Sequence, residues 1–285
     1  MECWLLVFWT LKMKNNMVMG KNLFLICNLK IIVLGQIFQM IDNSWYQFET
    51  SEVSELEITI HILEKQSLDY QLERYEIQGK NNLLFRYNSD IIVASCDWSY
   101  CILLELHDST NFSVFTNHIF YSRAIYHKMI QCHSSLVDWN GSGILFLGPS
   151  GIGKTTQAER WAEYRGADIV NGDLVFVQQT DDGFLGWGTP WHGSSPYCIN
   201  RAVPLKALVV LKQSKENRIQ ELTGFEKVSE VSNNVFYPTW LDDGMEICME
   251  ILNNLLLQLP VYRLDNRADV EAVEILEQEI KRIDE

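Results

Sequence analysis

The sequence predicts an α/β protein in which a phosphate-binding loop domain follows a β-rich N-terminal region. Three observations predict this class. Short apolar runs rich in strand-forming residues fill the chain up to about residue 106, a glycine-rich phosphate-loop motif stands at 148–156, and strand-like and helix-like segments alternate after it. We therefore expect a β-rich region over residues 1–110 and a phosphate-loop domain over residues 111–285.

The bulk composition limits the classes of partner and of site. With 285 residues, of which 47% are hydrophobic and 21% charged, the chain can bury one large core or two modest ones. The formal net charge of -14 repels nucleic-acid backbones, so we expect no nucleic-acid partner. Seven cysteines without a CxxC pair indicate neither a disulfide framework nor a zinc site, and they favour a reducing cytoplasm.

The apolar start of the chain does not predict a membrane anchor. Residues 3–11 are too few to span a bilayer, and polar side chains interrupt residues 23–38. We expect no membrane partner. One hypothesis is that residues 1–20 are a translated extension ahead of a later start such as Met19.

Five apolar runs between residues 22 and 106 predict β-strands, because they are rich in Ile, Val, Leu and Tyr and are separated by polar turns. The runs are LFLICNLKIIVLG, LEITIHIL, YEIQGKNNLLFRYN, DIIVASC and YCILLEL. Residues 117–135 follow, with Ile119, Ala124, Ile125, Met129 and Ile130 at helical spacing, and they predict a connecting helix.

The segment GILFLGPSGIGKTT combines a strand, a glycine-rich loop and the start of a helix. It satisfies the pattern G-x-x-x-x-G-K-[ST] between an apolar strand at 143–147 and a helix-forming stretch at 154–164, which disfavours a chance match. Glycines allow a tight turn whose amides face a phosphate, and the helix N-terminus adds positive potential. Lys154 would neutralise the β and γ phosphates of ATP, and Thr155 would bind Mg²⁺. The residues expected to bind the nucleotide are Gly148, Ser150, Gly151, Ile152, Gly153, Lys154, Thr155 and Thr156.

The segments after the loop continue an α/β pattern. Residues 167–179 predict one or two strands, and the apolar run at 205–213 predicts a buried strand. The tail predicts two helices at about 241–259 and 269–283, with Pro260 separating them.

Asp173 is the expected acidic residue of the metal site. It lies 19 residues beyond Lys154, directly before an apolar strand, where a carboxylate can face the phosphates. Asp168 and Asp182 are alternatives, but each is better explained as a solvated turn residue.

His133 stands 15 residues before Gly148, and the sequence between them contains SSLVD and GSG. Together with GPSGIGKT, these elements resemble the catalytic region of HPr kinase/phosphorylase and, more broadly, the phosphoenolpyruvate carboxykinase-like P-loop fold. The resemblance covers about residues 126–213 and does not extend to the N-terminal region. It implies a fold in which part of a sheet precedes the loop, which explains the loop's position halfway along the chain.

The resemblance also implies roles for two residues. Asp173 falls on the second of two adjacent aspartates of the family, with Gly172 at the first, so Asp173 would serve as catalytic base and metal ligand alone or with help from another group. His133 matches the family's histidine and would assist proton transfer at Asp173. Without the resemblance, His133 would be interpreted as a surface histidine at a helix end.

The segment at 186–205 departs from the family. HPr kinases carry a glutamate-containing signature there that is tied to phosphorylase activity, and its replacement disfavours phosphorolysis and HPr as the substrate. Glycines and prolines predict a structured active-site loop that carries Trp187, Trp191, His192, Ser194 and Ser195. By the resemblance, Arg201 would clamp the transferred phosphoryl group; the alternative is a surface ion pair.

The leading hypothesis is a Mg-ATP-dependent kinase that phosphorylates a Ser or Thr hydroxyl of a protein or peptide. The resemblance extends to kinases of ribosomal peptide precursors such as lasso peptides, and it makes a homo-oligomer an expectation. Two alternatives stay open. One is a small-molecule or carboxykinase-like phosphotransferase, although the carboxykinase metal motif is missing; the other is an ATP-hydrolysing switch protein.

Overall fold

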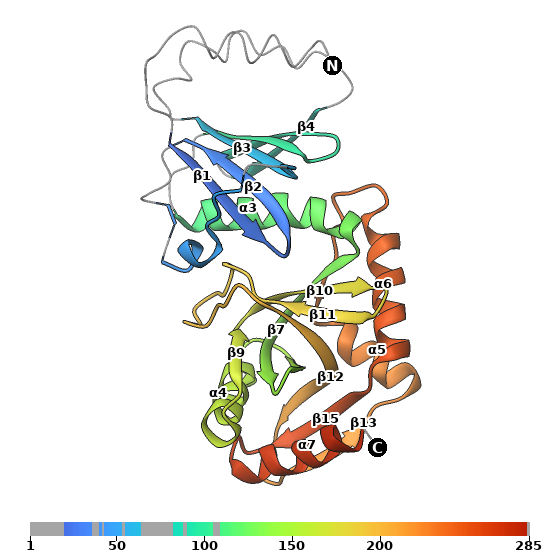
Figure 1. Ribbon diagram of the computed structural model, residues 1–285. Coiled ribbons are helices and arrows are strands. Elements are labelled where there is room, and N and C mark those ends of the chain that lie inside the picture. Colours follow the sequence, from blue (N-terminus) through green and yellow to red (C-terminus); the bar gives the residue numbers. More distant parts are fainter. Residues whose placement is uncertain are drawn as a thin grey trace, which may run out of the picture.

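The computed structural model describes residues 20–35, 40–41, 43–52, 55–63, 82–87, 90–104 and 109–283. Its strands form a six-stranded and a nine-stranded sheet, so the mixed α/β class and the β-rich N-terminal region are confirmed (Figure 1). The hypothesis of an N-terminal extension concerns residues that, apart from Gly20, lie outside the described ranges. Within those ranges, no helix has the length and apolar character needed to cross a membrane.

The six-stranded sheet contains strands from each of the five expected runs; residues 75–81 of the third run lie outside the described residues. Its order is β1-β2-β3-β6-β5-β4, with parallel pairing of β2 with β3 and of β3 with β6. Cys27 and Asn28 close the β1–β2 hairpin with φ values of 50° and 63°, the left-handed pair that a two-residue hairpin turn requires. The elements are β1 (Lys21–Ile26), β2 (Leu29–Leu34), the 3-10 helix η1 (Trp45–Phe48), β3 (Ile58–Leu63), β4 (Asn82–Tyr87), β5 (Asp90–Ser95) and β6 (Tyr100–Leu104).

The nine-stranded sheet carries the phosphate loop and closes on itself. Its path runs β11-β10-β7-β8-β12-β15-β13, and β11 also pairs with β12, so five strands form a ring. The apolar run at 205–213 lies in β12, which pairs in parallel with both β8 and β15 and is buried accordingly. The strands are β7 (Met129–Trp139), β8 (Ser142–Leu147), β9 (Asp168–Asn171), β10 (Leu174–Thr180), β11 (Gly183–Trp187), β12 (Ala202–Gln213), β13 (Arg218–Glu221), β14 (Val235–Phe236) and β15 (Val261–Asn266).

The helices confirm most expectations and correct one. The helix after the phosphate loop and the two tail helices are present, with β15 between the latter. The helix expected over 117–135 ends at Ala124, and Met129 begins β7 instead. Strand pairing overrides the helical spacing, because β7 pairs with β8, β9, β10 and β14. The helices are α3 (Ser109–Ala124), the 3-10 helix η3 (Ile125–His127), α4 (Lys154–Arg165), α5 (Gly224–Ser232), α6 (Gly244–Gln258) and α7 (Val270–Arg282).

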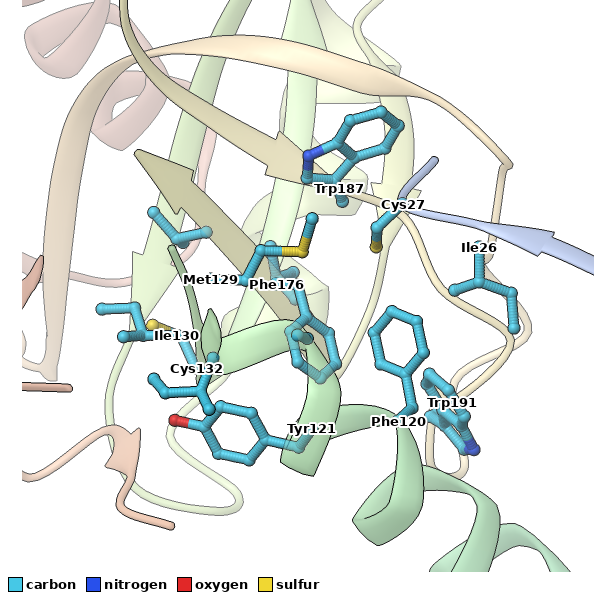
Figure 2. Close-up of a cluster of buried hydrophobic side chains, with 14 of the residues drawn as sticks. Ile26, Cys27, Phe120, Tyr121, Met129, Ile130, Cys132, Phe176, Trp187 and Trp191 are labelled. Carbon is cyan, nitrogen blue, oxygen red and sulfur yellow. The ribbon is translucent and has the colours of Figure 1, made fainter. Parts of the chain in front are cut away.

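One hydrophobic core joins the two sheets through α3. The helix lies between the N-terminal sheet and the β10–β11 end of the second sheet (Figure 1). Figure 2 shows Phe120 of α3 gathered with Phe176 of β10 and Trp191. A second core lies on the other side of the nine-stranded sheet, where residues of α4 and α7 pack on β8 and β12. The N-terminal region is therefore packed onto the part of the molecule that carries the phosphate loop.

Candidate active site

The phosphate loop leaves the end of β8 and enters α4 at Lys154, as the motif predicts. Gly148, Gly151 and Gly153 have φ values of 144°, 77° and 108°, which L side chains rarely adopt. Ser150 is exposed in the turn, the Ile152 amide donates to the Pro149 carbonyl (3.2 Å), and Thr156 is half-buried on α4. The expected nucleotide-binding residues thus form one loop at a helix N-terminus, a geometry suited to an anion.

Lys154 reaches back across this loop. Its side chain is buried, and Nζ donates to the Gly148 carbonyl (2.9 Å) and lies 3.1 Å from His133 Nε2. Burial lowers the pKa of Lys154, and the negative charge of Asp173 opposes part of that shift. The ammonium group is therefore held where it would meet a bound phosphate, and bound phosphate would favour its charged form.

His133 lies between Lys154 and Asp173. It sits in β7 opposite Leu174, not at a helix end, and its Nε2 is 3.2 Å from Asp173 Oδ1. The same nitrogen cannot accept a hydrogen bond from Lys154 and donate one to Asp173 at the same time. Without a proton on Nε2, His133 can bond Lys154, and with one it can bond Asp173. The histidine, the lysine and the aspartate that the sequence predicted are brought together.

The turn between β9 and β10 places Asp173 beside the start of α4. Thr155 Oγ1 donates to the Gly172 carbonyl (3.1 Å), and the Ser134 amide donates to the Asp173 carbonyl (2.8 Å). Hydroxyl and carboxylate oxygens are the donors that Mg²⁺ prefers, so Thr155 and Asp173 fit a magnesium ion that also takes oxygens from phosphate. Among the described residues, no group of three or more His, Cys, Asp or Glu is arranged to hold a metal by itself.

Asn171 shapes this turn and was not foreseen from the sequence. Its fully buried Oδ1 accepts from the amides of Asp173 (2.9 Å) and Leu174 (3.0 Å). Its Nδ2 donates to the Thr189 carbonyl (3.0 Å), in the segment after β11. An Asn two residues before an Asp is a signal for such a turn, but its second partner is 18 residues away and only the fold reveals it.

Asn234 is a second unforeseen positioning residue. It lies directly before β14, its Oδ1 accepts from the amide of Gly148 (2.9 Å), and its carbonyl accepts from the amide of His133 (2.8 Å). One residue therefore aligns the first glycine of the phosphate loop with the histidine. The 86 residues that separate Asn234 from Gly148 leave no short-range signal in the sequence.

The loop between β11 and β12, residues 188–201, covers the Asp173 turn. The Gly172 amide donates to the Tyr197 carbonyl (3.2 Å), and a Cβ atom added at Gly193 would lie 2.8 Å from Asp173 Cγ. His192 Nδ1 contacts the Ser195 carbonyl, and Ser195 packs against Gly172. The expected active-site loop thus lies at the proposed base.

The two tryptophans of the 186–205 segment require a correction. Trp187 and Trp191 are 6% and 3% exposed, so they belong to the core and are not presented to a substrate. Trp187 Nε1 donates to Gln178 Oε1 (2.9 Å), and the Trp191 ring lies 5.7 Å from that of Trp45 in η1. The N-terminal region also holds the loop through polar contacts, since Ser44 Oγ donates to the Pro190 carbonyl (3.2 Å).

Arg201 lies apart from the expected site. Its guanidinium bonds Asp138 (3.1 Å) and Asp168 (2.7 Å), at the end of β7 where Asp138 pairs with Gly143. The phosphate loop leaves the opposite end of β8, so the geometry favours the ion-pair interpretation of Arg201 over a phosphoryl clamp. Asp168 is engaged in this pair and Asp182 lies in the exposed β10–β11 turn, which leaves Asp173 as the carboxylate beside the loop.

Two relatives of this chain are named HPr kinase/phosphorylase. The HPr kinase/phosphorylase of Mycoplasmopsis pulmonis is 27% identical over 112 residues, which are 35% of this chain and 34% of that protein. The HPr kinase/phosphorylase of Listeria monocytogenes is 29% identical over 122 residues, 43% of this chain and 36% of that protein. The chain spans about a third of the length of these relatives. They confirm that the chain is HPr kinase-like.

A solved structure and a protein family are also similar to this chain. A solved structure, the Hpr(Ser) kinase/phosphatase from Coxiella burnetii, aligns with 53% of this chain and 93% of its own at 11% identity and a TM-score of 0.31. The family described as SynChlorMet cassette protein ScmC matches residues 101–280, from β6 to α7 and including the whole site. Since that match covers well over half of its length, the chain belongs to the family of SynChlorMet cassette protein ScmC.

Proposed function

We propose that this protein is a Mg-ATP-dependent kinase that transfers the γ-phosphoryl group to a Ser or Thr hydroxyl of a protein or peptide. One observation carries the proposal: His133 Nε2 lies 3.1 Å from the phosphate-loop ammonium of Lys154 and 3.2 Å from the carboxylate of Asp173. A group that would bind the donor and a group that would deprotonate the acceptor are thus linked through one titratable ring.

The proposed reaction divides the work among these residues. The amides of the phosphate loop and Lys154 hold the β and γ phosphates, and Thr155 with Asp173 would hold Mg²⁺, which supplies positive charge when bound. Asp173 accepts the proton of the acceptor hydroxyl, and the hydroxyl oxygen forms a bond to the γ phosphorus. The bond between the γ phosphorus and the bridging oxygen breaks, and that oxygen leaves with ADP. His133 then lies within reach of the proton on Asp173.

Two findings support a protein or peptide acceptor. The relatives are named kinases of HPr, and the family name describes a cassette protein, which supports a partner encoded beside this chain. A ribosomal peptide precursor made by the same gene cassette is the acceptor we propose. We propose a division into residues 1–110 and residues 111–285, in which the second part carries out the transfer. The contacts between η1 and the 188–201 loop support a bracing role for η1 on the acceptor side.

A transfer assay with Asp173→Asn tests the proposal. The protein is incubated with γ-labelled ATP, Mg²⁺ and Ser-containing peptides encoded beside its gene, and mass spectrometry detects phosphate on the products. We expect transfer to fall by about 10²–10⁴-fold, the usual contribution of a general base, with an unchanged melting temperature.

Asp182→Asn, in the exposed turn, is the matched control and should transfer at the wild-type rate. Full activity of Asp173→Asn would overturn the assignment of base and metal ligand. Lys154-dependent ADP formation with no phosphorylated product would instead favour the switch protein.

A further inference from the structure

The 188–201 loop brings a serine of this chain to the proposed catalytic base. Gly193 has its backbone against the Asp173 carboxylate, and the exposed Ser194 follows it directly. We propose that Ser194 is an autophosphorylation site, phosphorylated by the chain's own active site. This inference rests on the kinase function proposed above and names a second hydroxyl acceptor for it.

Gly193 determines how closely the loop approaches the base. Its φ is 59°, and an added Cβ atom would overlap the carboxylate of Asp173. Only a residue without a side chain lets the backbone lie there. Because neighbouring Cα atoms are about 3.8 Å apart, Ser194 begins one residue from this contact.

The turn that presents Ser194 is held on both sides. The Ser195 amide donates to the His192 carbonyl (3.1 Å), and the Tyr197 amide donates to Ser195 Oγ (3.2 Å). Tyr197 in turn bonds Glu159 of α4 through its hydroxyl (3.1 Å). The backbone beside Ser194 is therefore fixed before any reaction, which lowers the entropic cost of bringing an acceptor to the base.

Ser194 and Ser195 differ in their exposure to solvent. Ser195 is 8% exposed, its Oγ accepts from the Tyr197 amide, and a Cβ atom at Gly172 would lie 2.5 Å from Ser195 Cβ. Ser195 thus fills the space above Gly172. Ser194 is exposed, so its hydroxyl can turn toward a phosphoryl donor.

The chemistry balances with ATP as the donor. Asp173 takes the proton of the Ser194 hydroxyl, the bond from Oγ to the γ phosphorus forms, and ADP leaves with the electrons of the broken bond. The product places about two negative charges beside the carboxylate of Asp173. Their repulsion would drive the loop away from the base and open the acceptor side for another substrate.

The experiment uses the full chain with γ-labelled ATP and Mg²⁺ and no added acceptor. Intact mass and peptide mapping measure phosphate per chain, and a parallel assay measures Lys154-dependent ADP release. We expect incorporation to approach one phosphate per chain, on Ser194, at a first-order rate that dilution of the protein does not change. Ser194→Ala should reduce incorporation at least about 10-fold, to the level of Lys154→Ala, whereas Ser99→Ala in the N-terminal region should not.

The outcomes separate the two proposals. Phosphate that persists in Ser194→Ala, or that peptide mapping places on Ser195 or elsewhere, overturns the inference. A chain that phosphorylates an added peptide or releases ADP through Lys154, yet carries no phosphate on Ser194, overturns the inference while leaving a nucleotide site. A chain with neither activity contradicts the kinase proposal as well.

Discussion

The donor side and the acceptor side of the candidate site are built in different ways. The donor side, residues 143–165, is one continuous strand, loop and helix. The acceptor side, residues 188–201, is held by segments far apart in the chain. Ser44 and Asn171 donate hydrogen bonds to the carbonyls of Pro190 and Thr189, and the ring of Trp45 packs against that of Trp191. A continuous unit can be transferred between proteins with its chemistry intact, whereas an assembled loop changes whenever one of its supports changes.

The comparisons cover the site and its N-terminal support differently. The relatives named HPr kinase/phosphorylase match over 112 to 122 residues of the chain, while the six-stranded N-terminal sheet lies almost wholly before the region of the ScmC family match at 101–280. Both the donor side and the 188–201 loop lie inside the 101–280 match, whereas most of the sheet that supports the loop lies before it.

Lys154→Ala disrupts the donor side, and its expected effect is larger than that of Asn171→Ala or Arg201→Gln. Transfer should fall by about 10²–10³-fold, since a preorganised positive group is lost, while folding is retained because a desolvated ammonium is removed. In the wild type, kcat/KM for ATP should decline as pH rises through the lowered pKa of Lys154, because the neutral amine no longer attracts phosphate.

Rate measurements across alkaline pH test this, with Lys281→Ala on the exposed face of α7 as control. A decline that begins no earlier than the pKa of an ordinary lysine, about 10.4, would contradict the burial argument.

Asn171→Ala breaks the link between the two sides and has the next largest effect. The amides of Asp173 and Leu174 lose their acceptor and the Thr189 carbonyl loses its donor, so the free energy of unfolding should fall by about 2–3 kcal/mol. Transfer should fall by about 10²-fold because the Asp173 carboxylate is no longer held in place.

Chemical denaturation and the transfer assay measure both effects, with Asn253→Ala on the exposed surface of α6 as the matched control. If Asn171→Ala lost stability but kept its full transfer rate, the two sides would be independent.

Arg201→Gln changes a residue that lies apart from the expected site, and we expect only a small effect on stability and transfer. The arginine is 40% exposed and paired with Asp138 and Asp168, so the free energy of unfolding should change by at most about 1 kcal/mol. We expect the transfer rate to stay within about threefold of wild type. A loss of rate comparable to that of Lys154→Ala would restore the phosphoryl-clamp role.

The sequence predicted the local features of the site better than those that depend on distant segments. The phosphate loop, its strand and its helix lie where the motif predicts, and His133, Lys154 and Asp173 meet as the resemblance implies. Asn234 was missed because its partners are remote in sequence. Trp187 and Trp191 were misassigned because their burial depends on residues outside their own segment, such as Gln178 and Trp45. The helix expected over 117–135 failed because four strands compete for residues 129–139.

The sequence by itself determined the class of fold and the donor chemistry of this protein. Glycine conformations, a helix N-terminus and a neighbouring lysine act over a few residues, so the order of amino acids is enough to place them. Only the tertiary structure decided where Arg201 points, which residues hold the Asp173 turn, and that Gly193 lies against Asp173. These features arise from burial and from hydrogen bonds between distant segments, which exist only once the two sheets and α3 have packed together.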